Sequence, residues 1–181
     1  WDGVHVRGPG TEIGRHCGST ALSFNMHVCA TMWSGFIADG LDMSPAQRVD
    51  HQRIRAVHFA RVVEQGKVYS QPFSEGGAAT AGKAPWSTLA LRTEGGYRVS
   101  GRKIFASLSG AADYYGVLCT LETPAHGGGT LRDALYLAIP ADAPGVDRYV
   151  PRRRAIPSDR QDSHDGRALL RPLARRGGRD R

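Results

Sequence analysis

The chain has 181 residues, of which 40% are hydrophobic and 23% charged, as is usual for a soluble domain with an apolar core. No stretch approaches the roughly 20 apolar residues of a membrane span, and the first ten residues do not resemble a signal peptide, so we expect a cytoplasmic protein. The net charge of +7 resides mainly in residues 151–181, which hold ten Arg, no Lys and four Asp. Any argument for nucleic-acid binding is therefore confined to that tail.

The N-terminal segment is predicted to become helical after an irregular start. Residues 1–10 contain three glycines and one proline without periodicity, so we expect no regular element there. From Thr11 to Gly40 apolar residues recur at steps of three and four, which indicates an amphipathic helix with a buried stripe. The stripe comprises Leu22, Met26, Cys29, Trp33 and Phe36.

A second helix is predicted from Pro45 to about Gln65. Ser44 offers an N-cap hydroxyl and Gln47 completes a capping box, with proline at the first helical position. Gly66 stands where a left-handed residue commonly follows a helix. His51 and His58 are not spaced as metal ligands, and we expect both at the surface or edge.

After Gly66 the periodicity changes to that of strands, and this half is predicted to be antiparallel β structure. A tight hairpin is expected at Glu94–Tyr97, where two glycines permit positive φ. The candidate strands are residues 68–74, 88–93, 97–107, 114–121 and 134–139, and Pro140, Pro144 and Gly145 are expected to end the run.

Common catalytic and metal-binding motifs are absent. The chain contains no nucleophile elbow, phosphate loop or dinucleotide-binding turn. Ser100 and Lys103 match Ser-x-x-Lys but fall in a predicted strand, so we interpret the match as chance. Cys17, Cys29 and Cys119 lack paired spacing, which predicts neither disulfides nor a metal site.

Residues 71–80, Gln-Pro-Phe-Ser-Glu-Gly-Gly-Ala-Ala-Thr, form the most informative segment. A strand that ends in small residues allows a phosphate or a ring to approach the backbone. A plain connecting loop has the same composition. From the residues alone, both interpretations stay open.

Two blocks of sequence resemble the acyl-CoA dehydrogenase family. Ser74-Glu75-Gly76, with Thr80 after it, resembles the family's Thr-Glu-Pro block and the serine that follows. Gly101 to Ser107, Gly-Arg-Lys-Ile-Phe-Ala-Ser, resembles its Gly-x-Lys-x-Trp-Ile-Thr/Ser block. With the flanking helices and strands, the resemblance extends over roughly residues 11–147. Gly76 in place of proline and Ala81 in place of an acidic residue depart from the family pattern.

The resemblance implies a flavin site. Phe73 and Ser74 correspond to the strand that meets the flavin pyrimidine edge, and Thr80 to a residue near the diphosphate and the acyl-CoA substrate. Phe105 takes the place of the tryptophan against the isoalloxazine ring, and Ser107 that of a hydroxyl near N5. The implied cofactor-binding residues are Gln71, Pro72, Phe73, Ser74, Thr80, Phe105, Ala106 and Ser107, with FAD as cofactor and FMN as the alternative.

The resemblance also implies an α+β fold in which N-terminal helices precede an antiparallel β-barrel or sandwich domain. We expect an irregular segment at residues 1–10 and part of a helical domain at residues 11–66. A flavin-contacting β domain is expected at residues 67–150, and a disordered Arg-rich tail at residues 151–181. The family's C-terminal helical bundle has no counterpart, so we expect a truncated chain whose tail is the product of a shifted reading frame.

The implied parent reaction is α,β-dehydrogenation of an acyl-CoA thioester. The family's catalytic base lies in the bundle, so we assign no catalytic residue here and expect this chain to be inactive. An electron-accepting flavoprotein and a homo-oligomer are implied for the parent. Two alternatives stay open: a same-fold monooxygenase using reduced FMN and O2, and a non-catalytic protein whose tail binds nucleic acid.

Overall fold

The computed structural model describes residues 4–37, 39–77, 84–122, 129–149 and 167–170. The chain divides into two compact units. The first comprises residues 1–71 and 107–116, and the second residues 72–106 and 117–181. Among the described helices, none combines the length and the apolar character that crossing a membrane requires.

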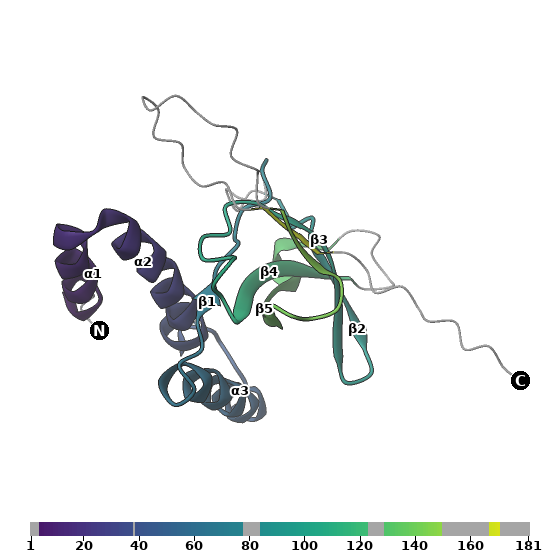
Figure 1. Ribbon diagram of the computed structural model, residues 1–181. Helices are drawn as coiled ribbons and strands as arrows, with labels where there is room; N and C mark the ends of the chain where they lie inside the picture. Colours follow the sequence, from purple (N-terminus) through teal and green to yellow (C-terminus); the bar gives the residue numbers. More distant parts are fainter. Residues whose placement is uncertain (1–3, 38, 78–83, 123–128, 150–166, 171–181) are drawn as a thin grey trace, which may run out of the picture. The chain divides into compact units, whose positions relative to one another are not determined.

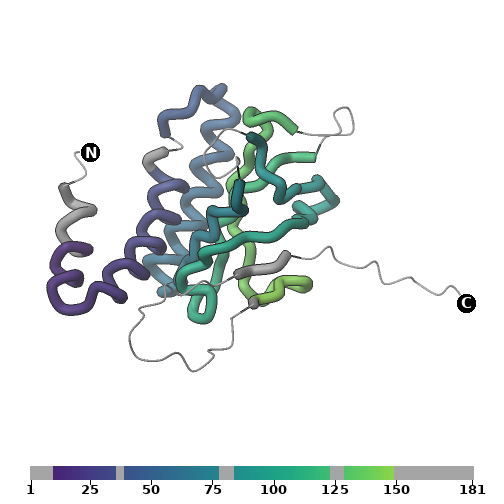
Figure 2. The backbone as a smooth tube through the Cα atoms, turned by 90° about the horizontal axis from the view of Figure 1, so that it is seen from above, coloured from purple at the N-terminus to yellow at the C-terminus, as the bar shows by residue number. Residues whose placement is uncertain are grey.

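The first unit begins with helix α1 (Val4–His16), followed by α2 (Gly18–Met32) and a π-helical turn η1 (Trp33–Ile37). The expectation of no regular element in residues 1–10 was wrong. Helix α1 packs against α2, where a Cβ on Gly14 would lie 3.7 Å from the Cβ of Ala21 (Figures 1 and 2). Tertiary packing of this kind outweighs the low intrinsic helix propensity of glycine and proline.

The stripe predicted on the first helical segment is only partly buried. Leu22 is 64% exposed, so its predicted burial was wrong, and the fully buried residue of α2 is Ala30. Met26, Cys29 and Trp33 are half-buried, while the side chain of Phe36 lies outside the described residues. The reason is that α2 meets strand β1 (Tyr69–Ser70) through His27, whose Nδ1 accepts a hydrogen bond from the Tyr69 backbone N–H at 3.0 Å. Leu22 precedes this contact by more than one turn.

Helix α3 (Pro45–Val63) confirms the predicted second helix and its capping box. Ser44 Oγ accepts a hydrogen bond from the Gln47 backbone N–H at 3.3 Å, and the Gln47 side chain accepts one from the Ser44 N–H at 2.9 Å. Gly66 has φ of 63°, in the left-handed region that the sequence predicted. Local sequence signals therefore determine both ends of this helix.

His58 lies in the core of the first unit, and its predicted surface position was wrong. It is 6% exposed and its ring meets Tyr69 edge-on at 4.4 Å between centroids. Tyr69 stacks on Tyr114, the first residue of strand β4 (Tyr114–Glu122), with which β1 pairs in parallel. Burial, together with the charges of Arg61 and His27, lowers the pKa of His58 to about 4.

The second unit is a curled, mixed sheet. Strands β2 (Leu89–Thr93) and β3 (Gly96–Lys103) form the predicted hairpin, with φ of 76° at Gly95 (Figures 1 and 2). Strand β2 also pairs with the C-terminal half of β4 in parallel, which corrects the expectation of a purely antiparallel sheet. Such pairing joins strands that are distant in sequence, so no local turn signal announces it.

Three further strands complete this sheet. Strand β5 (Ala134–Pro140) pairs with β4, and β6 (Val146–Tyr149) pairs with β7 (Arg167–Leu170), which also pairs antiparallel with β3. The predicted strand at 134–139 is confirmed, whereas β6 and β7 were missed. Strand β7 lies inside the tail for which disorder was expected, and the rest of that tail lies outside the described residues.

We expect the stability of the chain to fall between pH 6.5 and about 4 through His58. Because the folded-state pKa lies below the unfolded value, the unfolded chain binds the extra proton in this interval, and lowering the pH favours unfolding. The loss at pH 4 is on the order of 3 kcal/mol. Urea titrations at pH 7, 5.5 and 4 measure it.

His58→Phe serves as the control, since it keeps an aromatic ring against Tyr69 and cannot take up a proton. Its unfolding midpoint is expected to vary less with pH over this range than that of the unmodified chain. An equal pH dependence in both proteins would show that His58 is not the titrating group.

Candidate functional site

The second unit brings the two family-like blocks together at a single backbone bridge. The Ser74 carbonyl oxygen accepts a hydrogen bond from the Ile104 N–H at 2.8 Å, in an isolated antiparallel bridge. Continuing this register by one residue toward β3 places Glu75 opposite Lys103. The end of β3 is therefore tied to the segment that precedes β2.

Glu75 and Lys103 form a buried ion pair beside this bridge. Lys103 Nζ lies 2.6 Å from Glu75 Oε1, and their side chains are 0% and 2% exposed, respectively. The carboxylate also accepts hydrogen bonds from the Ser87 N–H at 2.6 Å, the Ser87 hydroxyl at 2.7 Å and the Thr88 N–H at 2.9 Å. Lys103 Nζ lies 4.4 Å from the centroid of the Trp86 ring.

The surroundings keep Glu75 ionised. Burial raises the pKa of its carboxyl, but the hydrogen bonds from Lys103, Thr88 and Ser87 outweigh burial and hold the pKa at about 2. Burial lowers the pKa of Lys103, and the hydrogen bond to Glu75 opposes that effect. With the carboxylate 2.6 Å away, we assign the ammonium form to Lys103 at neutral pH. Glu75 is thus unsuited to be a general base, which operates best with a pKa near the working pH.

Phe105 combines an exposed side chain with an unusual backbone conformation; among the described residues, Leu108 is the other non-glycine residue with positive φ. Phe105 is 53% exposed and has φ of 58°, a left-handed conformation that costs a non-glycine residue about 1–2 kcal/mol. Strand alternation would place its ring on the same face as the buried Lys103, and the positive φ turns the chain away from that pattern. Lys103 and Ala106, at 0% and 3% exposure, anchor the chain on either side. Backbone strain of this kind gathers at functional sites.

The other predicted site residues fall on both units. In the second unit Pro72 is fully buried, and Phe73 is half-buried against Trp86, with ring centroids 5.7 Å apart. In the first unit Gln71 is 5% exposed, and its Oε1 has no hydrogen-bond partner among the described residues. Also in the first unit, the Ser107 carbonyl oxygen accepts a hydrogen bond from Ser70 Oγ at 2.5 Å. Thr80 lies outside the described residues.

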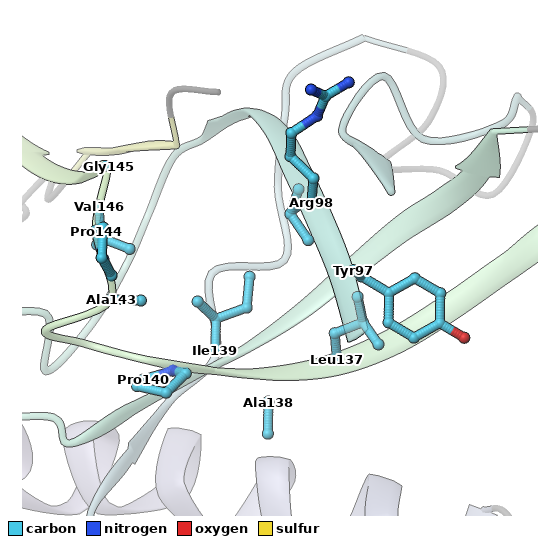
Figure 3. A pocket seen from close by; sticks show the side chains of 11 residues that line it. Tyr97, Arg98, Leu137, Ala138, Ile139, Pro140, Ala143, Pro144, Gly145 and Val146 are labelled. Atoms are coloured by element: carbon cyan, nitrogen blue, oxygen red, sulfur yellow. The ribbon is translucent and has the colours of Figure 1, made fainter. Parts of the chain in front are cut away.

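A pocket of about 260 Å³ lies elsewhere in the second unit, among β3, β5 and the turn before β6 (Figure 3). Leu137 and Ile139 project from β5 on one side of the strand, and Ala138 points to the other. Tyr97, at the hairpin end of β3, lines the pocket, whereas Phe105 follows the opposite end, about 26 Å further along an extended chain. None of the predicted site residues lines this pocket. In the described part of the chain, no group of three His, Cys, Asp or Glu residues could hold a metal ion.

Sequence comparison finds neither a protein-family model nor a curated protein that matches this chain. Solved structures do match. TdsC from Paenibacillus sp. A11-2, in complex with FMN and indole, has 21% identity and a TM-score of 0.57, over 91% of this chain and 36% of TdsC. PigA with FAD and proline has 17% identity and a TM-score of 0.53, over 84% of this chain and 36% of PigA.

A probable acyl-CoA dehydrogenase from Mycobacterium abscessus also matches, with 19% identity and a TM-score of 0.47. The match covers 66% of this chain and 30% of the dehydrogenase chain. The α+β fold of this chain is the one it shares with TdsC and PigA. The chain spans about a third of the length of these structures. Among the described residues, no helical bundle follows the sheet.

Glu75→Gln is expected to destabilise the second unit by about 3–5 kcal/mol, because it leaves the Lys103 charge buried without its counter-ion. The double variant Glu75→Gln/Lys103→Met should lose less than the sum of the two single changes, since it strands no charge. Urea denaturation of all four proteins measures both effects.

The same carboxylate predicts an acid dependence. Its folded-state pKa of about 2 lies below the ordinary value of 4.5, so the stability that it contributes is present above pH 4.5 and is lost as the pH falls toward 2. The Glu75→Gln variant should lack this component. Additive single variants, or equal acid dependence with and without Glu75, would contradict the ion pair.

Proposed function

We propose that this chain is the flavin-binding part of an acyl-CoA dehydrogenase-like oxidoreductase. The observation that carries the proposal is Phe105, an exposed aromatic ring on strained backbone, tied by the Ser74–Ile104 bridge to the segment of Phe73 and Ser74. These residues come from the two blocks that resemble the family's flavin-contacting segments. The fold shared with TdsC and PigA, solved with FMN and FAD, adds support.

The residues present fit a flavin. An isoalloxazine ring is flat and apolar on its faces, and an exposed phenylalanine offers a stacking surface for it. Gly76 and Gly77, just beyond the bridge, have φ of 83° and 70°, and a Cβ on either would meet nothing within 4 Å. Backbone this open allows a polar ring edge or a diphosphate to approach closely. Ser74 carries a hydroxyl two residues before Gly76, in the segment that is bridged to Ile104.

For the reaction, we propose α,β-dehydrogenation of an acyl-CoA thioester. A bound flavin would supply the hydride acceptor, and this chain's residues would orient the ring through Phe105, Phe73 and Ser74. The proton acceptor must come from elsewhere, because Glu75, the carboxylate that follows Ser74 in the sequence, is held in its ion pair with a pKa of about 2. An electron-accepting flavoprotein, homo-oligomerisation and a cytoplasmic location belong to the same proposal.

A flavin-dependent monooxygenase reaction is the second candidate. TdsC, which matches over 91% of this chain, is solved with FMN and indole rather than with a thioester. Gly76 and Ala81 also depart from the dehydrogenase pattern in the loop that would face the substrate. FMN would then be the cofactor, and O2 the second substrate.

The proposed flavin site predicts that Phe105→Ala weakens flavin binding about tenfold, since an aromatic stacking contact is worth about 0.5–1.5 kcal/mol beyond its area. Quenching of FMN and FAD fluorescence on titration with the 181-residue chain measures the affinity. Phe24→Ala is the matched control, because Phe24, at 37%, is the other exposed phenylalanine among the described side chains and lies on α2. A chain that quenches neither flavin contradicts the proposal, as does equal weakening by the two variants.

The two candidate reactions make different predictions. The 181-residue chain with FAD is expected not to reduce a dye with any acyl-CoA, because Glu75 is paired; dye reduction would show that a base is present after all. For the reaction itself, fusing a family-like helical bundle to this chain should confer acyl-CoA-dependent dye reduction. Oxygen consumption with reduced FMN, without dye reduction, would instead favour the monooxygenase.

A further inference from the structure

We propose that the Glu75–Lys103 ion pair is the positioning device that holds Phe105 in its exposed, left-handed conformation. The inference rests on the proposed flavin site, for which Phe105 would be the stacking surface. It assigns to the ion pair a role in presenting the ring, without contact to the flavin. Glu75 and Lys103 are therefore positioning residues and not catalytic ones.

The first step concerns how the end of β3 is anchored. Beyond Lys103, in the part of the chain that the structure describes, the ladder continues through the isolated bridge at Ile104, whose N–H donates a hydrogen bond to the Ser74 carbonyl oxygen. Glu75 and Lys103 are the adjacent cross-strand pair in that register. Their ion pair is thus the side-chain tie next to the point where the chain leaves the sheet.

The second step concerns the burial of Lys103. Its side chain is fully buried, and a buried ammonium requires a counter-charge or must reach water. Glu75 supplies the counter-charge and is itself fixed by the backbone N–H groups of Ser87 and Thr88, just before β2. The position of Lys103 is therefore set by β2 as well as by its own strand.

The third step joins this anchor to Phe105. A left-handed phenylalanine persists only when its neighbours over-determine it. After Phe105, Ala106 is buried. Before Phe105, Ile104 is held by the backbone hydrogen bond to Ser74 and Lys103 by the ion pair. Without the counter-charge, Lys103 would turn toward solvent, and without either charge the side-chain tie itself is lost. In both cases the backbone at Phe105 would lose one of the two constraints on its N-terminal side.

Fluorine NMR of the chain labelled with 3-fluorophenylalanine tests the inference without any flavin. The chain has five phenylalanines, and the resonance of Phe105 is identified by its absence in Phe105→Leu. We expect this resonance to move in Glu75→Gln and in Glu75→Gln/Lys103→Met, with a changed sensitivity to a soluble paramagnetic probe. It should stay in place in Lys67→Met, which removes the partly exposed ion pair with Asp113 in the first unit.

Flavin titration of the same proteins gives the second readout. Affinity for FMN and FAD should fall about tenfold in the two Glu75 variants and remain unchanged in Lys67→Met. A folded Glu75→Gln protein with an unmoved Phe105 resonance overturns the inference, whatever its flavin affinity. If Glu75→Gln does not fold, the double variant gives the same decision, because it strands no buried charge.

Glu75→Asp completes the series, since it keeps the charge and shortens the side chain. We expect the Phe105 resonance to move in the same direction by a smaller amount. An unmoved resonance would count against the positioning role of the ion pair. A chain that binds no flavin, while its Phe105 resonance moves as expected, leaves the positioning role standing and contradicts only the proposed flavin site.

Discussion

The second unit depends on one electrostatic constraint: a lysine with no exposed side-chain surface requires a carboxylate beside it. Glu75 meets that requirement with four hydrogen bonds, three of them from the two residues before β2 and one from the end of β3. The ion pair and these hydrogen bonds thereby join the segment of Glu75, the residues before β2 and the end of β3, which no continuous ladder connects in the described part of the chain. Removing either Glu75 or Lys103 would leave the other group buried without its partner, and this free-energy cost makes the pairing specific.

Local signals in the sequence were sufficient for part of the fold. The capping box at Ser44 and the glycine turn at Gly95 correctly located α3 and the hairpin, because each is decided by a few adjacent residues. Helix α1, strand β7 and the parallel pairing of β2 with β4 were not predictable in this way. They depend on partners distant in the chain, which override composition and propensity.

The candidate site shows the same division. The resemblance assigned Phe73, Ser74 and Phe105 to one flavin site, and the bridge between Ser74 and Ile104 is consistent with that assignment. The ion pair was missed although both residues stand in the quoted blocks, since spacing does not reveal that a glutamate and a lysine are buried together. His58 was misplaced for a related reason: its aromatic partner, Tyr69, lies on another element.

The pairing of β3 with β7 also sets the order of events during synthesis. The β2–β3 hairpin can close as soon as both strands have left the ribosome, within microseconds. Gly101 pairs with Leu170, about 70 residues later, and translation at roughly 5–20 residues per second takes several seconds to cover that distance. During this interval the outer edge of β3 has no strand beside it, so the nascent chain presents an open edge that other chains can pair with.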